Sequence, residues 1–230
     1  MRARNVLYAT VPLFAALSIG AVTAQAANSS DAASSAQDRV NDAVKVVHQM
    51  KQDPGLSRLL ARADGIFIVS HYGRGAFIVG GQGGGGVVLV RHDGTWTDPA
   101  FYNIGGGSVG LQAGGAGGSI AMILMSNKAV HKFENSTSTW SLNAGAGLTV
   151  VTYSGRAQAN SNNGDVVLWS NTKGLYGGLT AGVTDITPDT RMDHVYYRGR
   201  PDSRQILMGS VKNPDAGPLR NALSMHVAER

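Results

Sequence analysis

The amino-acid sequence predicts an α+β fold: an antiparallel β-sandwich or partial barrel, rich in glycine, with an N-terminal amphipathic helix and a C-terminal helix. Two observations predict this class. From residue 65 onward, short apolar runs follow one another with turn residues between them. Before and after these runs, apolar residues recur at helical spacing. Because the runs do not alternate with long helices, we do not expect a parallel α/β sheet.

The first expected helix has Ser35 as its N-cap, with Asp38 three residues later in a weaker form of the capping box. Its apolar face comprises Val40, Ala43, Val44, Val47 and Met50. Asp53-Pro54-Gly55 ends this helix, and a shorter helical piece with Leu56, Leu59 and Leu60 leads into the first strand. Residues 218–227 return to helical spacing and form the expected C-terminal helix.

The strands are expected where apolar or β-branched residues gather between turn residues. The earlier ones are 65–70, 76–81, 87–92, 108–114 and 119–125, and the later ones are 139–152, 164–170 and 174–186. One helical turn is expected at 127–133. Asp93-Gly94 and Asn162-Asn163-Gly164 are typical of hairpin turns.

Glycine is the unusual component of this chain. There are 31 glycines, and fifteen of them stand between Gly80 and Gly118. Glycine weakens a strand, so this concentration predicts bulges, sharp curvature or close packing of backbones.

The first residues resemble a secretory signal peptide. Arg2 and Arg4 precede an apolar run over residues 6–22, and Ala24-Gln25-Ala26 offers a small-residue cleavage site. A retained membrane anchor is the alternative, but no positively charged stop follows the run. We therefore expect a signal peptide over 1–26, a disordered leader over 27–35 and a domain over 36–230. The chain has no cysteine for a disulfide or a lipid anchor, so we expect export to the periplasm or the envelope surface.

The charge balance argues against nucleic acid as a partner. The formal net charge is +5, but without Arg2 and Arg4 there are 18 basic residues and 15 acidic ones. This surplus is small and scattered, and no basic run is interleaved with aromatic residues.

Three strings look like enzyme motifs. Residues 81–86 and 105–110 both match the dinucleotide pattern G-x-G-x-x-G, and 106–110 match the nucleophile elbow G-x-S-x-G around Ser108. Each motif requires a helix directly after it, whereas these strings lead into apolar or glycine-broken strands. The six histidines lack the spacing of a zinc site, and His92 is expected at a turn or on the surface. The chain has only two glutamates, Glu134 and Glu229, so we do not expect a paired-glutamate acid/base site. We therefore expect no metal and no cofactor.

The run from Ala76 to Met125 resembles the SYLF domain. Its signature residues here are Trp96, Pro99, Phe101, Tyr102, Gly105, Gly106, Gly107, Ser108, Gly110 and Gln112, and we interpret them as structural. The strand AFIVGG at 76–81 and the segments 173–178 and 195–197 also look like family elements. The resemblance covers roughly residues 36–228.

This resemblance implies a non-enzymatic lipid-binding domain. Eukaryotic members associate with phosphoinositide membranes and some with actin, whereas bacterial members are exported, and actin has no place in a periplasm. The family's membrane contact is attributed to a basic amphipathic region at the N-terminal end. Here, however, residues 31–52 hold three acids and three bases. We therefore expect the Val/Met face of the helix to pack on the domain.

The candidate lipid-binding residues are the bases Lys45, Lys51, Arg58, Arg62, Arg74, Arg198, Arg200 and Arg204. The expected partner is a phospholipid membrane, preferably an anionic one. The sequence leaves two alternatives open: a structural or protein-interaction module of the periplasm, and a serine hydrolase using Ser108.

Overall fold

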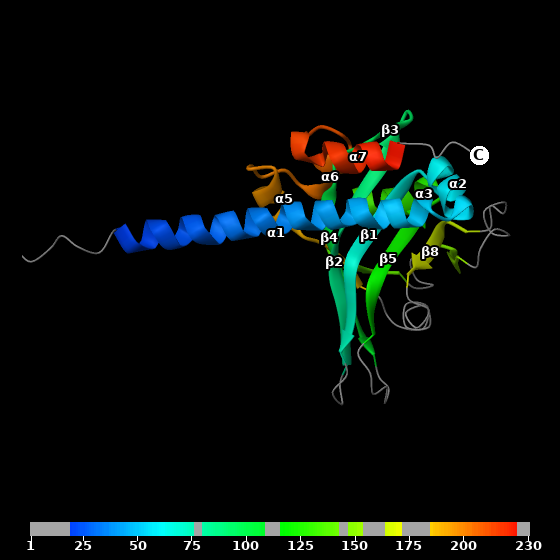
Figure 1. Cartoon of the computed structure of the whole chain (residues 1–230), viewed down its shortest axis with the longest axis horizontal. Helices are drawn as coiled ribbons and strands as arrows, with labels where there is room; N and C mark the ends of the chain where they lie inside the picture. The colour runs from blue at the N-terminus through cyan, green and yellow to red at the C-terminus, as the bar shows by residue number, and fades with distance from the viewer. Residues whose placement is uncertain are drawn as a thin grey trace, which may run out of the picture.

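The chain folds around a curled, mostly antiparallel sheet (Figure 1). The computed structural model describes residues 19–75, 80–108, 116–142, 147–153, 164–171 and 185–224. Within these residues the strands are β1 (Gly65–Gly75), β2 (Gly80–His92), β3 (Thr95–Trp96), β4 (Ala100–Ser108), β5 (Ala116–Leu124), β6 (Trp140–Ser141), β7 (Val150–Thr152), β8 (Val166–Ser170) and β9 (Asp185–Pro188). Their order is β6-β9-β4-β2-β1-β5-β8-β7, and β3 pairs with β2. The predicted α+β class with a partial barrel is confirmed.

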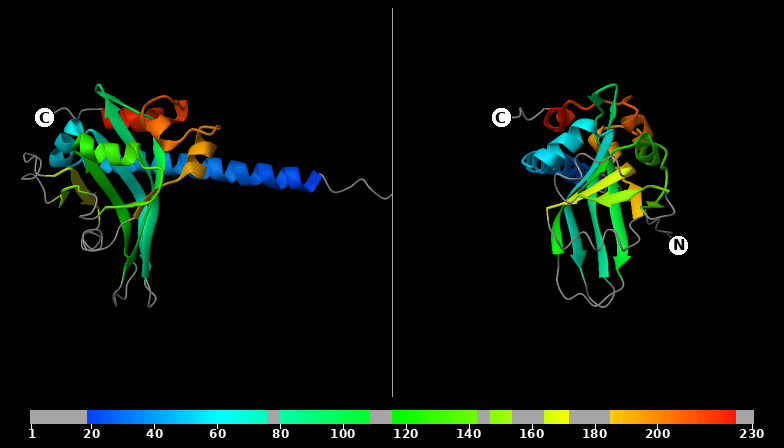
Figure 2. Two further views of the ribbon diagram at one scale, coloured as in Figure 1. Left: turned by 180° about the vertical axis from the view of Figure 1, so that it is seen from behind. Right: turned by 90° about the vertical axis from the view of Figure 1, so that its right-hand side faces the viewer.

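Helices cover both faces of the sheet (Figure 2). They are α1 (Ile19–Lys51), α2 (Pro54–Arg62), α3 (Asn127–Glu134), α5 (Thr190–Tyr196), α6 (Ser203–Leu207), the short 3-10 helix η4 (Pro214–Ala216) and α7 (Gly217–Ser224). One core lies between the sheet and α1, α2 and α7, and a second lies between the other face and α3 and α6. In β1, Ile66 and Ile68 join the first core while Phe67 joins the second. Burial on both faces explains why the strands are continuous apolar runs.

The first helix begins earlier than the sequence indicated. α1 already includes residues 27–35, for which a disordered leader was expected, and Ser35 lies inside it. The prediction of an N-cap at Ser35 is therefore wrong; its hydroxyl donates to the carbonyl of Asp31 within the helix, at 2.8 Å. The reason is that no glycine or proline stands between Gly20 and Pro54. An existing helix extends through such residues more easily than a new one starts, because nucleation is the costly step.

The predicted apolar face of α1 is confirmed as a packing face. Val40, Ala43, Val47 and Met50 are fully buried against the sheet and α7. Arg39 fixes the helix to α5, because its guanidinium lies 3.1 Å from the carboxylate of Asp189. None of the helices in the described part of the chain combines the length and apolar character that crossing a bilayer requires.

Glycines in β2 let other groups approach closely, as the sequence predicted. A Cβ atom on Gly86 would lie 2.2 Å from the carbonyl oxygen of Ile68 in β1. A Cβ atom on Gly85 would lie 2.4 Å from the guanidinium carbon of Arg39. The pairing of β1 with β2 also shifts register between Ile68 and Gly73, which indicates a bulge. These glycines therefore make room for a neighbouring strand and for α1.

Several strand boundaries differ from the prediction. Residues 80–92 form one strand through the glycines, rather than two strands at 76–81 and 87–92. Residues 100–107, for which no strand was expected, form β4 together with Ser108. The expected strand at 108–114 lies outside the described part except for Ser108, and so do residues 76–79. Within the expected strands at 139–152, 164–170 and 174–186, the described residues form β6 and β7, β8 and the start of β9. Residues 143–146 and 174–184 of these predictions lie outside the described part.

The predicted turns have different outcomes. Asp93-Gly94 is confirmed as a tight turn between β2 and β3, with φ of 49° and 81°. Residues 162 and 163 of the second turn lie outside the described part. However, β7 and β8 on either side of it pair in parallel, so they are not the two arms of one hairpin. The helical turn at 127–133 is confirmed as α3, and the C-terminal helix is confirmed up to Ser224.

Candidate functional site

The signature residues that the structure describes have structural roles. Trp96, Phe101 and Tyr102 are buried. The hydroxyl of Tyr102 donates to the carbonyl of Phe133 at 2.8 Å, and the carbonyl of Pro99 accepts from the hydroxyl of Tyr197 at 2.8 Å. The glycines of β4 pair with those of β2, whereas residues 110 and 112 lie outside the described part. The block thus joins the sheet to α3 and α5.

Two buried aspartates complete this junction, and the sequence analysis missed both. Asp98 forms an ion pair with Arg220 of α7 and accepts from the backbone N–H of Asn213 at 2.5 Å. Asp193 of α5 accepts from the N–H of Phe101 and from the hydroxyl of Ser203, both at 2.8 Å. Burial raises the pKa of Asp193 to about 7. A signal existed for Asp98 alone, because this acid stands inside the tryptophan-x-x-proline turn of the signature.

The first of the enzyme-like strings lacks the context that its chemistry requires, whereas the residues that follow Ser108 lie outside the described part. Residues 81–86 lie inside β2, which continues as a strand to His92, so these glycines do not open a helix. Ser108 is the last residue of β4 and pairs with Gly80 in an antiparallel ladder. Asp165, an acid that follows Ser108 in the chain, accepts from the hydroxyl of Ser126 at 2.6 Å and from the N–H of Thr149 at 2.8 Å. The Ser126 hydrogen bond lowers the pKa of Asp165, which therefore serves as an acceptor at the start of α3.

The two candidate bases on α1 contact the protein itself. The ammonium of Lys45 donates to Asp42 at 2.7 Å, and this bond raises the pKa of Lys45. The ammonium of Lys51 donates to the carbonyls of Ala222 and Leu223 at the end of α7, at 2.5 and 3.1 Å. Burial lowers the pKa of Lys51. A cation at a helix C-terminus stabilises that helix, so Lys51 helps to dock α7 on α1.

Arg58, Arg62 and Arg74 do not form one group. The first two lie on α2, where Arg62 is exposed and Arg58 is half-buried. Arg74 lies near the far end of β1, in register with Gln82 and Ala116. At about 3.3 Å per residue, the strand carries Arg74 roughly 30 Å away from α2.

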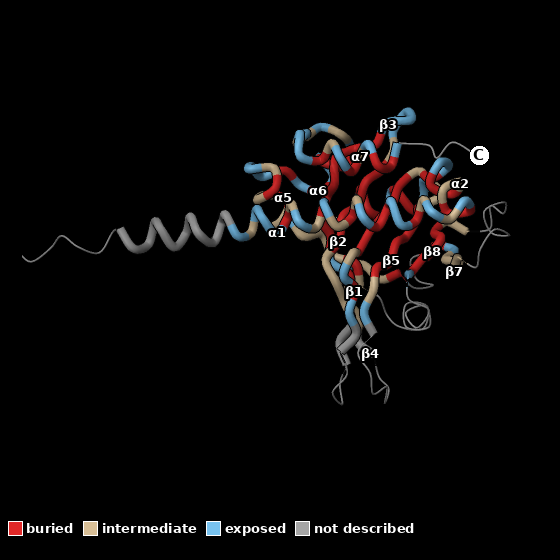
Figure 3. The backbone as a smooth tube through the Cα atoms, in the orientation of Figure 1, coloured by how far each residue is buried: buried red, intermediate tan, exposed pale blue. Residues whose placement is uncertain are grey.

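Arg198, Arg200 and Arg204 do share one surface. Arg198 and Arg200 are exposed on the connection from α5 into α6, and Arg204 is exposed on α6; much of the connection is pale blue in Figure 3. Lys212, which the sequence analysis did not include, is exposed a few residues after α6. Residues 197–213 therefore hold four bases and one acid, Asp202. Asp202 caps α6 by accepting from the N–H of Gln205 at 2.7 Å.

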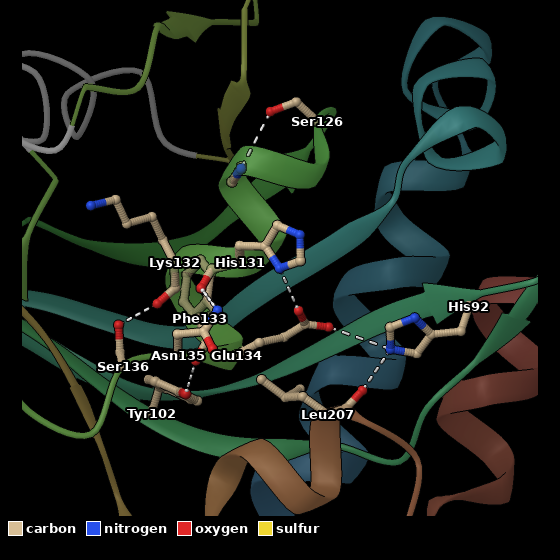
Figure 4. A network of polar contacts seen from close by, with 11 residues as sticks. His92, Tyr102, Ser126, His131, Lys132, Phe133, Glu134, Asn135, Ser136 and Leu207 are labelled. Atoms are coloured by element: carbon tan, nitrogen blue, oxygen red, sulfur yellow. Dashed lines mark hydrogen bonds and ion pairs between the residues drawn. The ribbon is translucent and has the colours of Figure 1, made fainter.

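A polar network next to this surface also went unpredicted (Figure 4). The buried carboxylate of Glu134 on α3 lies 3.0 Å from His131 Nδ1 and 3.4 Å from His92 Nε2. The same nitrogen of His92 lies 2.9 Å from the carbonyl oxygen of Leu207, so its hydrogen-bond role there is that of a donor. The network links α3, β2 and the end of α6. Among the described residues, no three His, Cys, Asp or Glu side chains are arranged to hold a metal ion.

A hollow of about 470 Å³ lies where α1 meets α2. It is lined by Gln49, Gln52, Asp53, Pro54, Leu56, Trp169 and Asn171, and none of the candidate bases takes part. Its carboxylate, Asp53, caps α2 and accepts from the hydroxyl of Tyr153 at 2.8 Å. We therefore assign this carboxylate a structural role.

Comparison with known proteins identifies the family. The profile of Ysc84, described as Las17-binding protein actin regulator, matches residues 105–226. The chain belongs to the Ysc84, or SYLF-domain, family. The match confirms the resemblance that the signature residues indicated, and it includes the glycines at the end of β4 and the helices α5 to α7. No solved structure matches the chain.

Three relatives illustrate how the SYLF domain occurs in other proteins. Protein YSC84 of Saccharomyces cerevisiae is 31% identical over 171 residues, which cover 72% of this chain and 36% of that protein. The SH3 domain-containing protein PJ696.02 of Schizosaccharomyces pombe is 28% identical over 178 residues, with 74% and 40% covered. The SH3 domain-containing YSC84-like protein 1 of Bos taurus is 26% identical over 165 residues, with 69% and 47% covered. This SYLF chain thus spans less than half the length of each relative.

Proposed function

We propose that this SYLF protein binds anionic phospholipid membranes peripherally and without enzymatic activity, at the bacterial cell envelope. The observation that carries the proposal is the exposed group of Arg198, Arg200 and Arg204 on one connection. Each base near an anionic leaflet contributes about 1 kcal/mol, so three together contribute about 3 kcal/mol. This attraction is screened within about 10 Å at 0.1 M salt, so the proposed binding is sensitive to ionic strength.

Export is part of the same proposal. The basic start, the apolar run and the Ala24-Gln25-Ala26 site support cleavage after the first 26 residues. The mature chain would then meet the membrane from the periplasm. This step can be tested with a radiolabelled or tagged full-length chain, whose mass should decrease on secretion.

A protein partner is the alternative. One curated relative is named LAS seventeen-binding protein 3, and two others carry SH3 domains in their names. Those names describe proteins more than twice as long as the region matched here. The exposed arginines favour the membrane, because their attraction to lipid phosphates requires no second protein surface of matching shape.

Two charge reversals at separate places on the domain test the proposal. Arg200→Glu/Arg204→Glu changes the connection into α6, whereas Lys45→Glu/Arg62→Glu makes the same change in net charge on α1 and α2. Arg198 is left unchanged because its φ is 51°, a backbone conformation sensitive to substitution. Co-sedimentation with phosphatidylglycerol vesicles should fall roughly thirtyfold or more for the first variant, since about 2 kcal/mol of attraction is lost.

The control variant should bind within about threefold of the wild type, a difference of less than 1 kcal/mol. Equal losses in both variants would mean that net charge alone matters, and would contradict a defined surface on α5 and α6. A greater loss in the control variant would move the site to α1 and α2.

A further inference from the structure

One apolar side chain stands out on the surface beside the arginines. Met208 follows the last residue of α6 and is 53% exposed. Within the described part of the chain, it is the one large hydrophobic residue in the exposed class. Leaving this side chain in water loses stabilisation that burial would supply. A single exposed apolar residue is common on protein surfaces, so the neighbouring residues decide whether it has a role.

Met208 and Arg204 lie on the same side of α6. They are four residues apart, and the N–H of Met208 donates to the carbonyl of Arg204 at 2.8 Å. Residues with this spacing are neighbours on a helix surface. The opposite side of the helix, with Ile206 and Leu207, is fully buried in the second core.

A second base stands close to the methionine. Gly209 has φ of 76° and turns the chain directly after Met208. A Cβ atom built on Gly209 would lie 4.0 Å from the ammonium nitrogen of Lys212. The ammonium of Lys212 therefore lies near the residue that follows Met208, and Arg204 lies one helical turn before Met208. Arg200 precedes α6 in the chain.

The end of α6 is held firmly beneath this surface. The carbonyl of Leu207 accepts from His92, which also contacts the buried carboxylate of Glu134 (Figure 4). At the start of α6, the hydroxyl of Ser203 donates to the buried Asp193. A helix fixed at both ends presents Met208 without the entropy cost of ordering a loop.

We propose that Met208 is an apolar anchor that enters an anionic bilayer at its interface, while Arg200, Arg204 and Lys212 contact lipid phosphates around it. This inference rests on the proposed membrane function and names the part of the domain that penetrates. Charge complementarity selects the occupant: an exposed apolar side chain with exposed bases before and after it in the chain matches a surface with phosphates outside and acyl chains beneath. A protein groove would have to combine the same two features in one place.

A tryptophan placed at the anchor position reports insertion directly. Met208→Trp should show a blue shift of emission on adding phosphatidylglycerol vesicles, and quenching by lipids brominated on their acyl chains, relative to the wild type with its native tryptophans. Gln49→Trp, at an exposed position of α1 on the other face of the sheet, is the matched control and should show neither effect.

Binding strength supplies the second readout. Met208→Gln keeps the size and the charges but removes the apolar character, and it should weaken sedimentation with these vesicles about fivefold to tenfold. Met208→Leu should bind like the wild type. Because the side chain is at the surface, circular dichroism and unfolding of all variants should match the wild type.

The outcomes separate the two proposals. Vesicle-bound Met208→Trp protein without a spectral shift or quenching would overturn the anchor while leaving membrane binding intact. Quenching at Gln49→Trp in its place would also overturn it and would put α1 in the membrane. A wild-type chain that does not sediment with anionic vesicles would refute the proposed function and the anchor together.

Discussion

Replacing Gly86 by alanine should destabilise the protein far more than replacing Gly73. A Cβ atom at Gly86 would lie 2.2 Å from the carbonyl oxygen of Ile68 and 2.8 Å from side-chain atoms of Phe67 and Val69. The closest of these is backbone of the adjacent strand, so β1 and β2 must separate to relieve the contact. Overpacking of a core costs typically 1–3 kcal/mol, and a backbone contact this short places Gly86→Ala at about 3 kcal/mol.

Gly73 is the matched control in the same pair of strands. A Cβ atom there would meet nothing within 4 Å, so Gly73→Ala should change the free energy of unfolding by about 0.5 kcal/mol or less. Urea denaturation gives both free energies, and for a chain of this length about 3 kcal/mol corresponds to a decrease in Tm of roughly 6–12 °C. Equal stabilities for the two variants would refute the explanation of the glycines as sites of close approach.

Two further predictions concern charged groups. Arg39→Leu should lower the free energy of unfolding by about 1–2 kcal/mol, because the partly buried pair with Asp189 is lost. A double-mutant cycle with Asp189→Asn should give a coupling energy near 1 kcal/mol, and zero coupling would contradict the pairing. Burial raises the pKa of Asp193 from 3.8 to about 7, so the folded state binds a proton that the unfolded state has released. Stability from this group is therefore present at low pH and is lost as pH rises from about 4 to 7, by at most about 4 kcal/mol. Asp193→Asn should therefore reduce the dependence of the free energy of unfolding on pH, measured by urea denaturation at several pH values. An unchanged pH dependence would contradict the raised pKa of Asp193.

Local patterns of the sequence were sufficient for the fold class. The apolar runs of β1, β5 and β8 and the Asp93-Gly94 turn depend on neighbouring residues, and each was placed correctly. Residues 82–86 of β2 and 100–107 of β4 were not predicted as strand, because glycine has no side chain to show periodicity. Their pairing with each other, and not their composition, makes them strands.

Contacts between segments that are distant in the chain could not be predicted from the sequence. Nothing near Asp98 points to Arg220, and nothing near His92 points to Glu134. The candidate bases show the same limit. Arg58, Arg62 and Arg74 are close in the chain but are separated by the length of β1, whereas Lys51 is used to cap α7. Only the arginines between α5 and α6 stayed together, because a short connection keeps them near one another.

Membrane binding by the wild-type chain tests the central claim most directly. We would measure co-sedimentation with vesicles of pure phosphatidylcholine and with vesicles of rising phosphatidylglycerol content, each at low and at high salt. We predict binding that increases with the anionic fraction and falls strongly at high salt, as expected for exposed arginines at a charged surface. Absence of binding to every vesicle at low salt would contradict the account and leave a protein partner as the leading function of this SYLF domain.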